Sequence, residues 1–71
     1  MIFVKGVSKM PEWIKQRVYA LYEECIQDVE RNRPKKNERY YIAIGEVMAI
    51  EALMDRLFME YDNDRVPELY L

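Results

Sequence analysis

The chain contains no histidine, one cysteine and two glycines among its 71 residues. Without histidine, it lacks the commonest general base and metal ligand. One cysteine cannot form an intramolecular disulfide, and one thiol among scattered carboxylates does not make a structural zinc site. Two isolated glycines do not form a phosphate-binding loop. We therefore predict no catalytic residue, no cofactor and no metal site, and we expect a protein that is not an enzyme.

The side chains left for chemistry are one thiol and two pairs of carboxylates. Cys25 falls in the middle of an apolar helix face, where no basic neighbour would lower the pKa of the thiol. Glu24 and Asp28 are four residues apart, as are Glu51 and Asp55. Carboxylates at this spacing can bind magnesium, but Glu24 and Asp28 lie on a flank away from the apolar face. We interpret the thiol as core packing and the acids as solvated surface.

Long apolar runs are also missing. No uninterrupted apolar stretch approaches the roughly 20 residues that a membrane span requires. The opening residues 1–4 are too short for the core of a signal peptide and are followed by Lys5 and Gly6. An unpaired cysteine on an apolar face fits a reducing compartment. We expect a cytoplasmic protein without a membrane segment.

The size of the chain limits the core that it can form. A domain this short buries only about 60% of its unfolded surface and usually depends on a disulfide, a metal or a partner subunit. The composition, 51% hydrophobic and 34% charged, is too apolar for a disordered chain. We therefore predict a single domain, residues 1–71, that is stabilised by oligomerisation.

Two segments show the hydrophobic spacing of amphipathic helices. In the first, residues 11–31, apolar side chains recur at steps of three and four residues, namely Ile14, Val18, Leu21, Cys25 and Val29. Pro11 suits the first helical turn, and Pro34 disfavours helical backbone at Arg33. Trp13 lies roughly opposite the apolar face, so we expect it to be exposed or covered by a terminal segment.

The second segment, residues 38–61, has an apolar surface that is too wide for one neighbouring helix to cover. Asn37 offers an N-cap, and the seam that follows consists of Ala43, Val47, Ile50, Met54, Leu57 and Tyr61. Further apolar residues extend the surface well to one side, namely Tyr40, Tyr41, Ile44, Met48, Ala52, Phe58 and Met59. We therefore expect this helix to contact two neighbours.

Together these patterns predict an all-α fold, an antiparallel two-helix hairpin with short extended N- and C-terminal segments. The short link between the helices makes them antiparallel neighbours. Residues 2–7 and 66–71 then emerge at the same end, where they either pair as a two-stranded ribbon or cover Trp13. We expect two hairpins to dimerise into a four-helix bundle.

The predicted surface for a second subunit or another protein partner is the flank that the hairpin leaves uncovered. It comprises Tyr19, Tyr22, Ile26, Tyr41, Ile44, Met48, Glu51 and Met59. Glu51 is the one charge inside this apolar band. It either marks the rim of two contact surfaces or reaches an arginine or a tyrosine hydroxyl and fixes how subunits dock.

The charge pattern supplies the alternative to a protein-binding surface. Residues 30–39 carry five basic and two acidic side chains, whereas residues 40–71 carry two basic and seven acidic ones. The basic cluster consists of Arg31, Arg33, Lys35, Lys36 and Arg39, and it would contact either a polyanion or an acidic protein. The acidic pI, near 5.1, disfavours a DNA-binding module. We therefore predict a homodimeric protein–protein interaction module (an adaptor, inhibitor or regulator), with a small nucleic-acid-binding regulator as the alternative.

Overall fold

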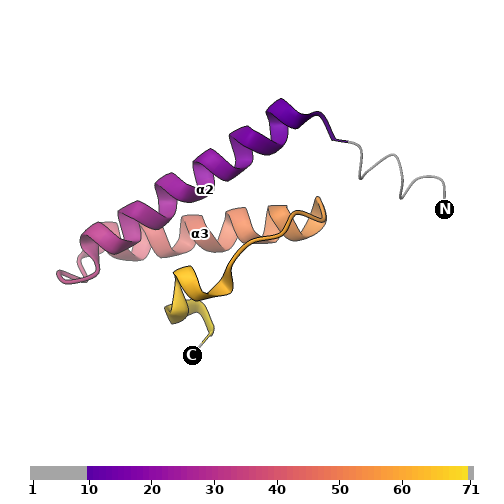
Figure 1. Cartoon of the computed structure of the whole chain (residues 1–71). Coiled ribbons are helices and arrows are strands. Elements are labelled where there is room, and N and C mark those ends of the chain that lie inside the picture. The colour runs from indigo at the N-terminus through magenta and orange to yellow at the C-terminus, as the bar shows by residue number, and fades with distance from the viewer. Residues whose placement is uncertain (1–9, 71) are drawn as a thin grey trace.

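Residues 10–70, which the computed structural model describes, form a helical hairpin followed by a C-terminal segment that folds back on it (Figure 1). Helix α2 spans Glu12–Asn32 and helix α3 spans Glu38–Arg56. Two short 3₁₀ helices follow, η1 at Asn63–Arg65 and η2 at Pro67–Tyr70. Within residues 10–70 there are helices and no strands, so the all-α hairpin is confirmed.

The two predicted terminal segments have different outcomes in the structure. The N-terminal segment, residues 2–7, lies outside the described residues. The C-terminal segment is not extended, because residues 67–70 form η2. The expectation of an extended C-terminal segment was therefore wrong. Trp13 is exposed, at 71%, as one of the two expectations had it.

The loop between the helices follows from local backbone chemistry. After the last residue of α2, Asn32, the amides of Lys35 and Lys36 donate to the Asn32 carbonyl at 3.1 and 2.9 Å. The predicted N-cap is confirmed, since the side chain of Asn37 accepts a hydrogen bond from the amide of Tyr40 at 3.0 Å. This bond satisfies one of the amides that a helix N-terminus leaves without an intrahelical partner.

Helix α3 ends at Arg56, five residues before the predicted end at Tyr61. The amide of Met59 donates to the carbonyl of Met54 at 2.9 Å, and the amide of Phe58 donates to the carbonyl of Asp55 at 3.2 Å. These two bonds define a Schellman motif, with Phe58 in the left-handed region at φ 57°. Met54 and Met59 are both buried, which is the apolar contact that accompanies this motif. The predicted boundary was wrong because the apolar spacing continues beyond the turn.

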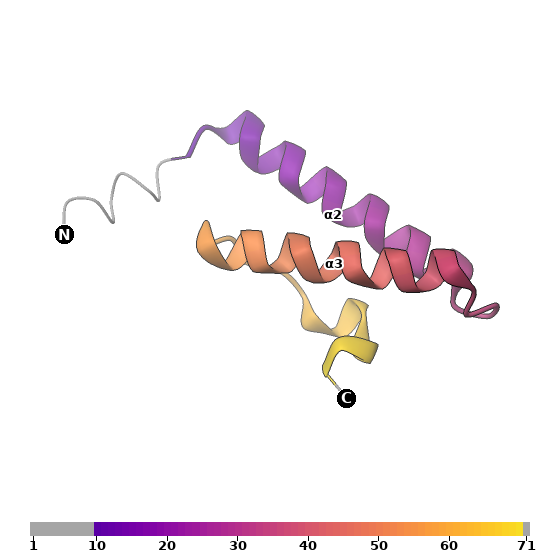
Figure 2. The same cartoon turned by 180° about the vertical axis from the view of Figure 1, so that it is seen from behind.

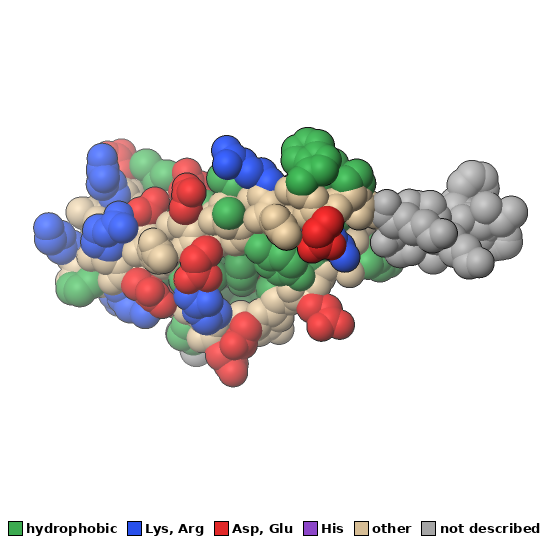
Figure 3. All heavy atoms as spheres, turned by 45° about the horizontal axis from the view of Figure 1, so that its top comes forward, with side chains coloured by type: hydrophobic (Ala, Val, Ile, Leu, Met, Phe, Trp, Pro, Cys, Tyr) green, Lys and Arg blue, Asp and Glu red, His purple; other side chains and the backbone are tan. Residues whose placement is uncertain are grey.

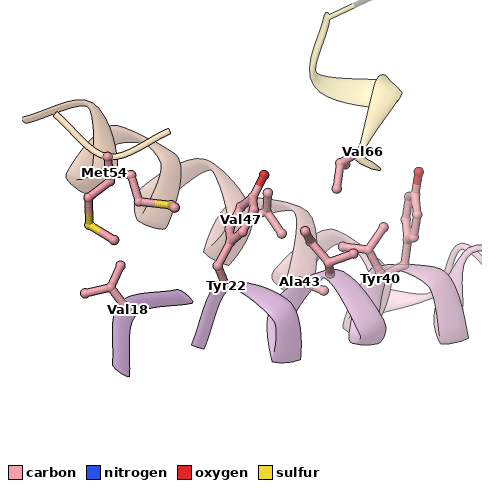
Figure 4. Close-up of a cluster of buried hydrophobic side chains, with 10 residues drawn as sticks. Val18, Tyr22, Tyr40, Ala43, Val47, Met54 and Val66 are labelled. Atoms are coloured by element: carbon pink, nitrogen blue, oxygen red, sulfur yellow. The ribbon is translucent and has the colours of Figure 1, made fainter. Parts of the chain in front are cut away.

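The chain after this turn, residues 59–70, is named here the C-terminal clasp. Its first part passes in front of α3 in Figure 1 and behind α3 in Figure 2, and the rest lies below α3 in both views, so the clasp covers one side of the hairpin. Met59 is 6% exposed and Val66 is completely buried. Figure 4 shows Val66 reaching from the clasp toward side chains of the hairpin.

The core therefore has three contributors. The buried apolar side chains are Val18, Tyr22, Ile26 and Val29 of α2, Tyr40, Ala43, Val47 and Met54 of α3, and Met59 and Val66 of the clasp. Leu21, which the spacing places in the core, is 39% exposed, and Cys25 is partly exposed. Both lie on the edge of α2 that faces away from the clasp, so the clasp cannot cover them.

Candidate interaction surfaces

Glu51 is buried at 6% exposure and joins the clasp to both helices. Its Oε2 accepts a hydrogen bond from the hydroxyl of Tyr22 at 2.7 Å, and its Oε1 accepts one from the hydroxyl of Tyr70. Among residues 10–70, neither a lysine nor an arginine forms a salt bridge with it. The carboxylate thus reaches tyrosine hydroxyls, but those of its own chain. It fixes the clasp, and it lies where the contact of α3 with α2 meets the contact of α3 with the clasp.

The two tyrosines are held in the protonated form that donates these bonds. Burial, followed by the hydrogen bond to Glu51, raises the pKa of Tyr22 well above its ordinary value of 10.0. The hydrogen bond to Glu51, followed by burial, does the same for the pKa of Tyr70. Tyr61 packs edge-on against Tyr22 with ring centroids 5.8 Å apart. These contacts form an aromatic cluster around the buried carboxylate.

A second tie joins the clasp to the loop end of the hairpin. Glu68 accepts hydrogen bonds from Nε and Nη2 of Arg33 at 2.8 and 3.1 Å, and from the hydroxyl of Tyr40 at 2.8 Å. Burial alone would raise the pKa of Glu68. The hydrogen bonds from Arg33 and Tyr40 outweigh burial and hold that pKa below its ordinary value of 4.5. The charged form of Glu68 therefore stabilises the folded clasp.

Two further residue pairs join the clasp to α2. Both oxygens of Glu23 accept hydrogen bonds from the guanidinium of Arg65, at 3.1 and 2.7 Å. The hydrogen bond from Arg65 lowers the pKa of Glu23. The hydroxyl of Tyr19 donates to the backbone carbonyl of Glu60 at 2.8 Å. With the hydroxyl of Tyr61, which donates to Asp55 at 2.8 Å, bonds at five residues of the clasp set it in one position.

The clasp occupies much of the flank that the sequence assigns to a partner. Of the eight residues predicted there, Tyr22, Ile26, Glu51 and Met59 are buried within the chain and Ile44 is partly buried. Only Tyr19, Tyr41 and Met48 are exposed. The buried four face other parts of the same chain in this structure, and their contact with a second subunit stays a prediction. The second neighbour of α3 on that flank is its own C-terminal segment.

What remains open is the outward side of α3, named here the outer strip. It consists of seven exposed residues without a charge among them, namely Tyr41, Ile42, Gly45, Met48, Ala49, Ala52 and Leu53. The four large side chains are exposed by 61% (Tyr41), 56% (Ile42), 55% (Met48) and 45% (Leu53). A Cβ added at Gly45 would meet no atom within 4 Å. Contiguous apolar surface of this kind marks interaction sites.

The outer strip continues into an open pocket beside the clasp. The pocket has a volume of about 310 Å³ and is lined by Met48, Glu51, Ala52, Asp55, Tyr61, Leu69 and Tyr70. Met48 and Ala52 belong to both surfaces. Ile42 and Leu53, on the other edge of the strip, were not predicted as interface residues. Their signal in the sequence is the small residues Gly45 and Ala49, which interrupt the polar side of α3.

The predicted basic cluster is divided by the fold. Arg33 is bound to Glu68, and Arg31 forms an exposed salt bridge with Asp28 at 2.7 Å. Lys35, Lys36 and Arg39 are exposed. Figure 3 shows basic side chains gathered at the end of the molecule where the loop joins the helices. This loop end is the second candidate surface.

Chemistry-bearing side chains are sparse in the part of the chain that the structure describes. No group of three or more His, Cys, Asp or Glu residues among residues 10–70 is placed to hold a metal ion. Burial, together with the charges of Glu46 and Asp28, raises the pKa of the Cys25 thiol, which disfavours the reactive thiolate. None of the helices in this range combines the length and the apolar character needed to cross a membrane.

Comparisons with protein-family models, with curated proteins and with solved structures find no match.

Proposed function

We propose that this protein is a non-enzymatic protein–protein interaction module that acts as a small adaptor, inhibitor or regulator. The outer strip of α3 is the observation that carries the proposal. It presents seven exposed residues without a charge, although 34% of the chain is charged. A surface helix of a small soluble domain usually has a polar outward face.

Helix α2 provides a comparison within the same molecule. Its outward side, although it includes Trp13, Tyr19 and Ala20, is rich in polar residues, namely Glu12, Gln16, Arg17, Glu24, Gln27 and Glu30. Helix α3 also exposes charged residues, namely Glu38, Arg39, Glu46, Asp55 and Arg56, but all of its exposed uncharged residues are apolar or glycine, whereas those of α2 include Gln16 and Gln27. Tyr41 and Met48 are residue types enriched at protein interfaces, and methionine adapts its shape to different partners. These features support binding to an apolar protein surface.

The same support extends to a homodimer of four helices, two from each hairpin, in which the two α3 helices are in contact and each α2 lies on the outside. The clasp covers one side of each hairpin, so a second hairpin would dock on the side of α3 that is still open. Burial of the strip would supply the apolar area that a domain of 71 residues has difficulty burying alone.

Light scattering and sedimentation over a wide range of concentrations test this proposal. We expect the mean mass to rise above that of the 8.7 kDa monomer with concentration. Met48→Glu places a charge on the strip at a position that is 55% exposed, so the fold should tolerate it while association weakens. Ala20→Glu, on the outward side of α2, is the matched control and should leave association unchanged. Equal association of the two variants would refute the assignment of the strip.

The loop end supports a second candidate, binding of nucleic acid through Lys35, Lys36 and Arg39. Fluorescence anisotropy with a short labelled duplex at low salt is the measurement. Under this alternative, binding falls steeply as salt is added, and Lys35→Ala with Lys36→Ala weakens it. Absence of binding at low salt would eliminate the alternative.

A further inference from the structure

We infer that the outer strip binds a second copy of this chain, with the two α3 helices antiparallel and related by a two-fold axis that passes near residue 47. This inference rests on the proposed function and gives its surface one occupant and one geometry. The charges at the two ends of the strip and the apolar residues between them support it.

The strip has an acid at one end and a base at the other. Glu38 and Arg56 are the first and last residues of α3, eighteen positions apart, or about five full turns at 3.6 residues per turn. They therefore lie on the same side of the helix, in line with Gly45 and Ala49. Both are exposed, and neither forms a salt bridge within residues 10–70. Both charges are thus available to a partner that covers the strip.

An antiparallel pair uses these charges twice. Residue 47 is midway between Glu38 and Arg56, so a two-fold axis there brings Glu38 of each copy to Arg56 of the other. Such an interface is isologous, because the same surface serves both subunits. A parallel pair would instead place Glu38 against Glu38 and Arg56 against Arg56, which is unfavourable. Charge complementarity thus selects both the second copy and its direction.

The apolar residues of the strip agree with this arrangement. On one edge, Ile42 of each copy faces Leu53 of the other, since the two residues lie at nearly equal distances on either side of residue 47. On the other edge, the large ring of Tyr41 faces the small Ala52. Near the axis Gly45, beside which an added Cβ would meet nothing within 4 Å, leaves room for the two backbones to approach. The arrangement thus pairs two apolar side chains on one edge and a large ring with a small residue on the other.

The size of the strip sets the strength of the dimer. From residue 41 to residue 53 it is about 18 Å long at 1.5 Å per residue. One helix face of this length buries less than the roughly 800 Å² per partner of a standard interface. The dimer is therefore weak and in exchange with the monomer. Its dissociation constant should be measured at micromolar protein concentrations and at low ionic strength, where the end charges are least screened.

The test compares Glu38→Lys, Arg56→Glu and the double variant by sedimentation equilibrium. Each single reversal places two like-charge contacts in the dimer, and we expect the Kd to rise about three- to tenfold. The double variant restores both contacts, and its Kd should return to within about twofold of the original. Lys35→Glu, in the loop and away from the strip, is the control that should not change the Kd.

The fold itself responds in the opposite direction, which separates the two effects. A base in the first turn and an acid in the last turn of α3 both oppose the helix dipole. In thermal unfolding at low protein concentration, the monomer of the double variant should therefore be the least stable of the variants, although its dimer is restored. If the double variant dimerises more tightly than the single variants while its monomer is less stable, a change in folding alone cannot explain the result.

The outcomes distinguish the inference from the proposed function. If the chain dimerises, Met48→Glu weakens it, and charge reversal has no effect, the antiparallel geometry is overturned while the interaction surface stands. If Met48→Glu leaves the dimer intact, the strip is not the interface and both fail. A strictly monomeric protein at high micromolar concentration overturns the second copy as the occupant and leaves a different protein partner.

Discussion

Phe58 allows the sharpest test of why α3 ends where it does. Its φ of 57° lies in the left-handed region, which costs a residue with a Cβ about 1–2 kcal/mol. Glycine has no such penalty but loses about 0.5–1 kcal/mol more conformational entropy on folding. We therefore predict that Phe58→Gly is more stable than Phe58→Ala by about 0.5–1 kcal/mol. The two variants lack the same ring, which is 69% exposed, so their difference isolates the backbone term.

Urea unfolding followed by far-UV circular dichroism at one fixed protein concentration measures this difference. The matched control is Ala20→Gly on the exposed side of α2, where glycine should reduce the free energy of unfolding by about 0.5–1 kcal/mol. The glycine effect thus changes sign between positions 20 and 58. If the free energy of unfolding of Phe58→Ala equals or exceeds that of Phe58→Gly, the Schellman turn does not terminate α3 in solution.

Two further predictions concern the ties of the clasp. Tyr22→Phe should reduce the free energy of unfolding by about 2 kcal/mol and Tyr70→Phe by about 1 kcal/mol, because the former bond to Glu51 is buried whereas Tyr70 is half exposed. In urea unfolding, the loss of free energy in the double variant should differ from the sum of the two single losses, because both hydroxyls share one carboxylate. A loss equal to that sum would contradict the cluster. Because the pKa values of Glu23 and Glu68 are lowered from 4.5, their stabilisation is present above that pH and is lost as the pH falls below it. The free energy of unfolding should decline there, and less steeply for Glu68→Gln; identical pH profiles would show that Glu68 does not hold the clasp.

Features set by neighbouring residues could be predicted from the sequence. The spacing of apolar residues gives the two helices, because it depends only on the 3.6-residue period. Asn37 gives the start of α3 to the residue, since a side-chain cap acts within one turn. The effect expected of Pro34 was wrong in detail, because Arg33 before it keeps helical angles (φ −56°, ψ −43°) and the backbone becomes left-handed only at Lys36 (φ 47°). Each of these signals acts over a few residues and needs no knowledge of distant parts of the chain.

The candidate surfaces were predicted only in part. The excess apolar width of α3 correctly indicates a second neighbour, and Tyr41 and Met48 are in the outer strip. The identity of that neighbour could not be read, because residues 66–70 are too short to show a period. Glu51, the one charge in the apolar band, was the local sign of a specific contact, but its partners Tyr22 and Tyr70 are 29 and 19 residues away.

By itself, then, the sequence determined an all-α hairpin, its loop and its shortage of catalytic side chains. The tertiary structure decided where α3 stops, which flank the chain covers for itself and which side it leaves open. Hydrophobic periodicity records which residues avoid water, but it does not record which surface shields them. That choice depends on bonds between distant residues, such as Glu68 with Arg33 and Arg65 with Glu23, which form only once the clasp is in place.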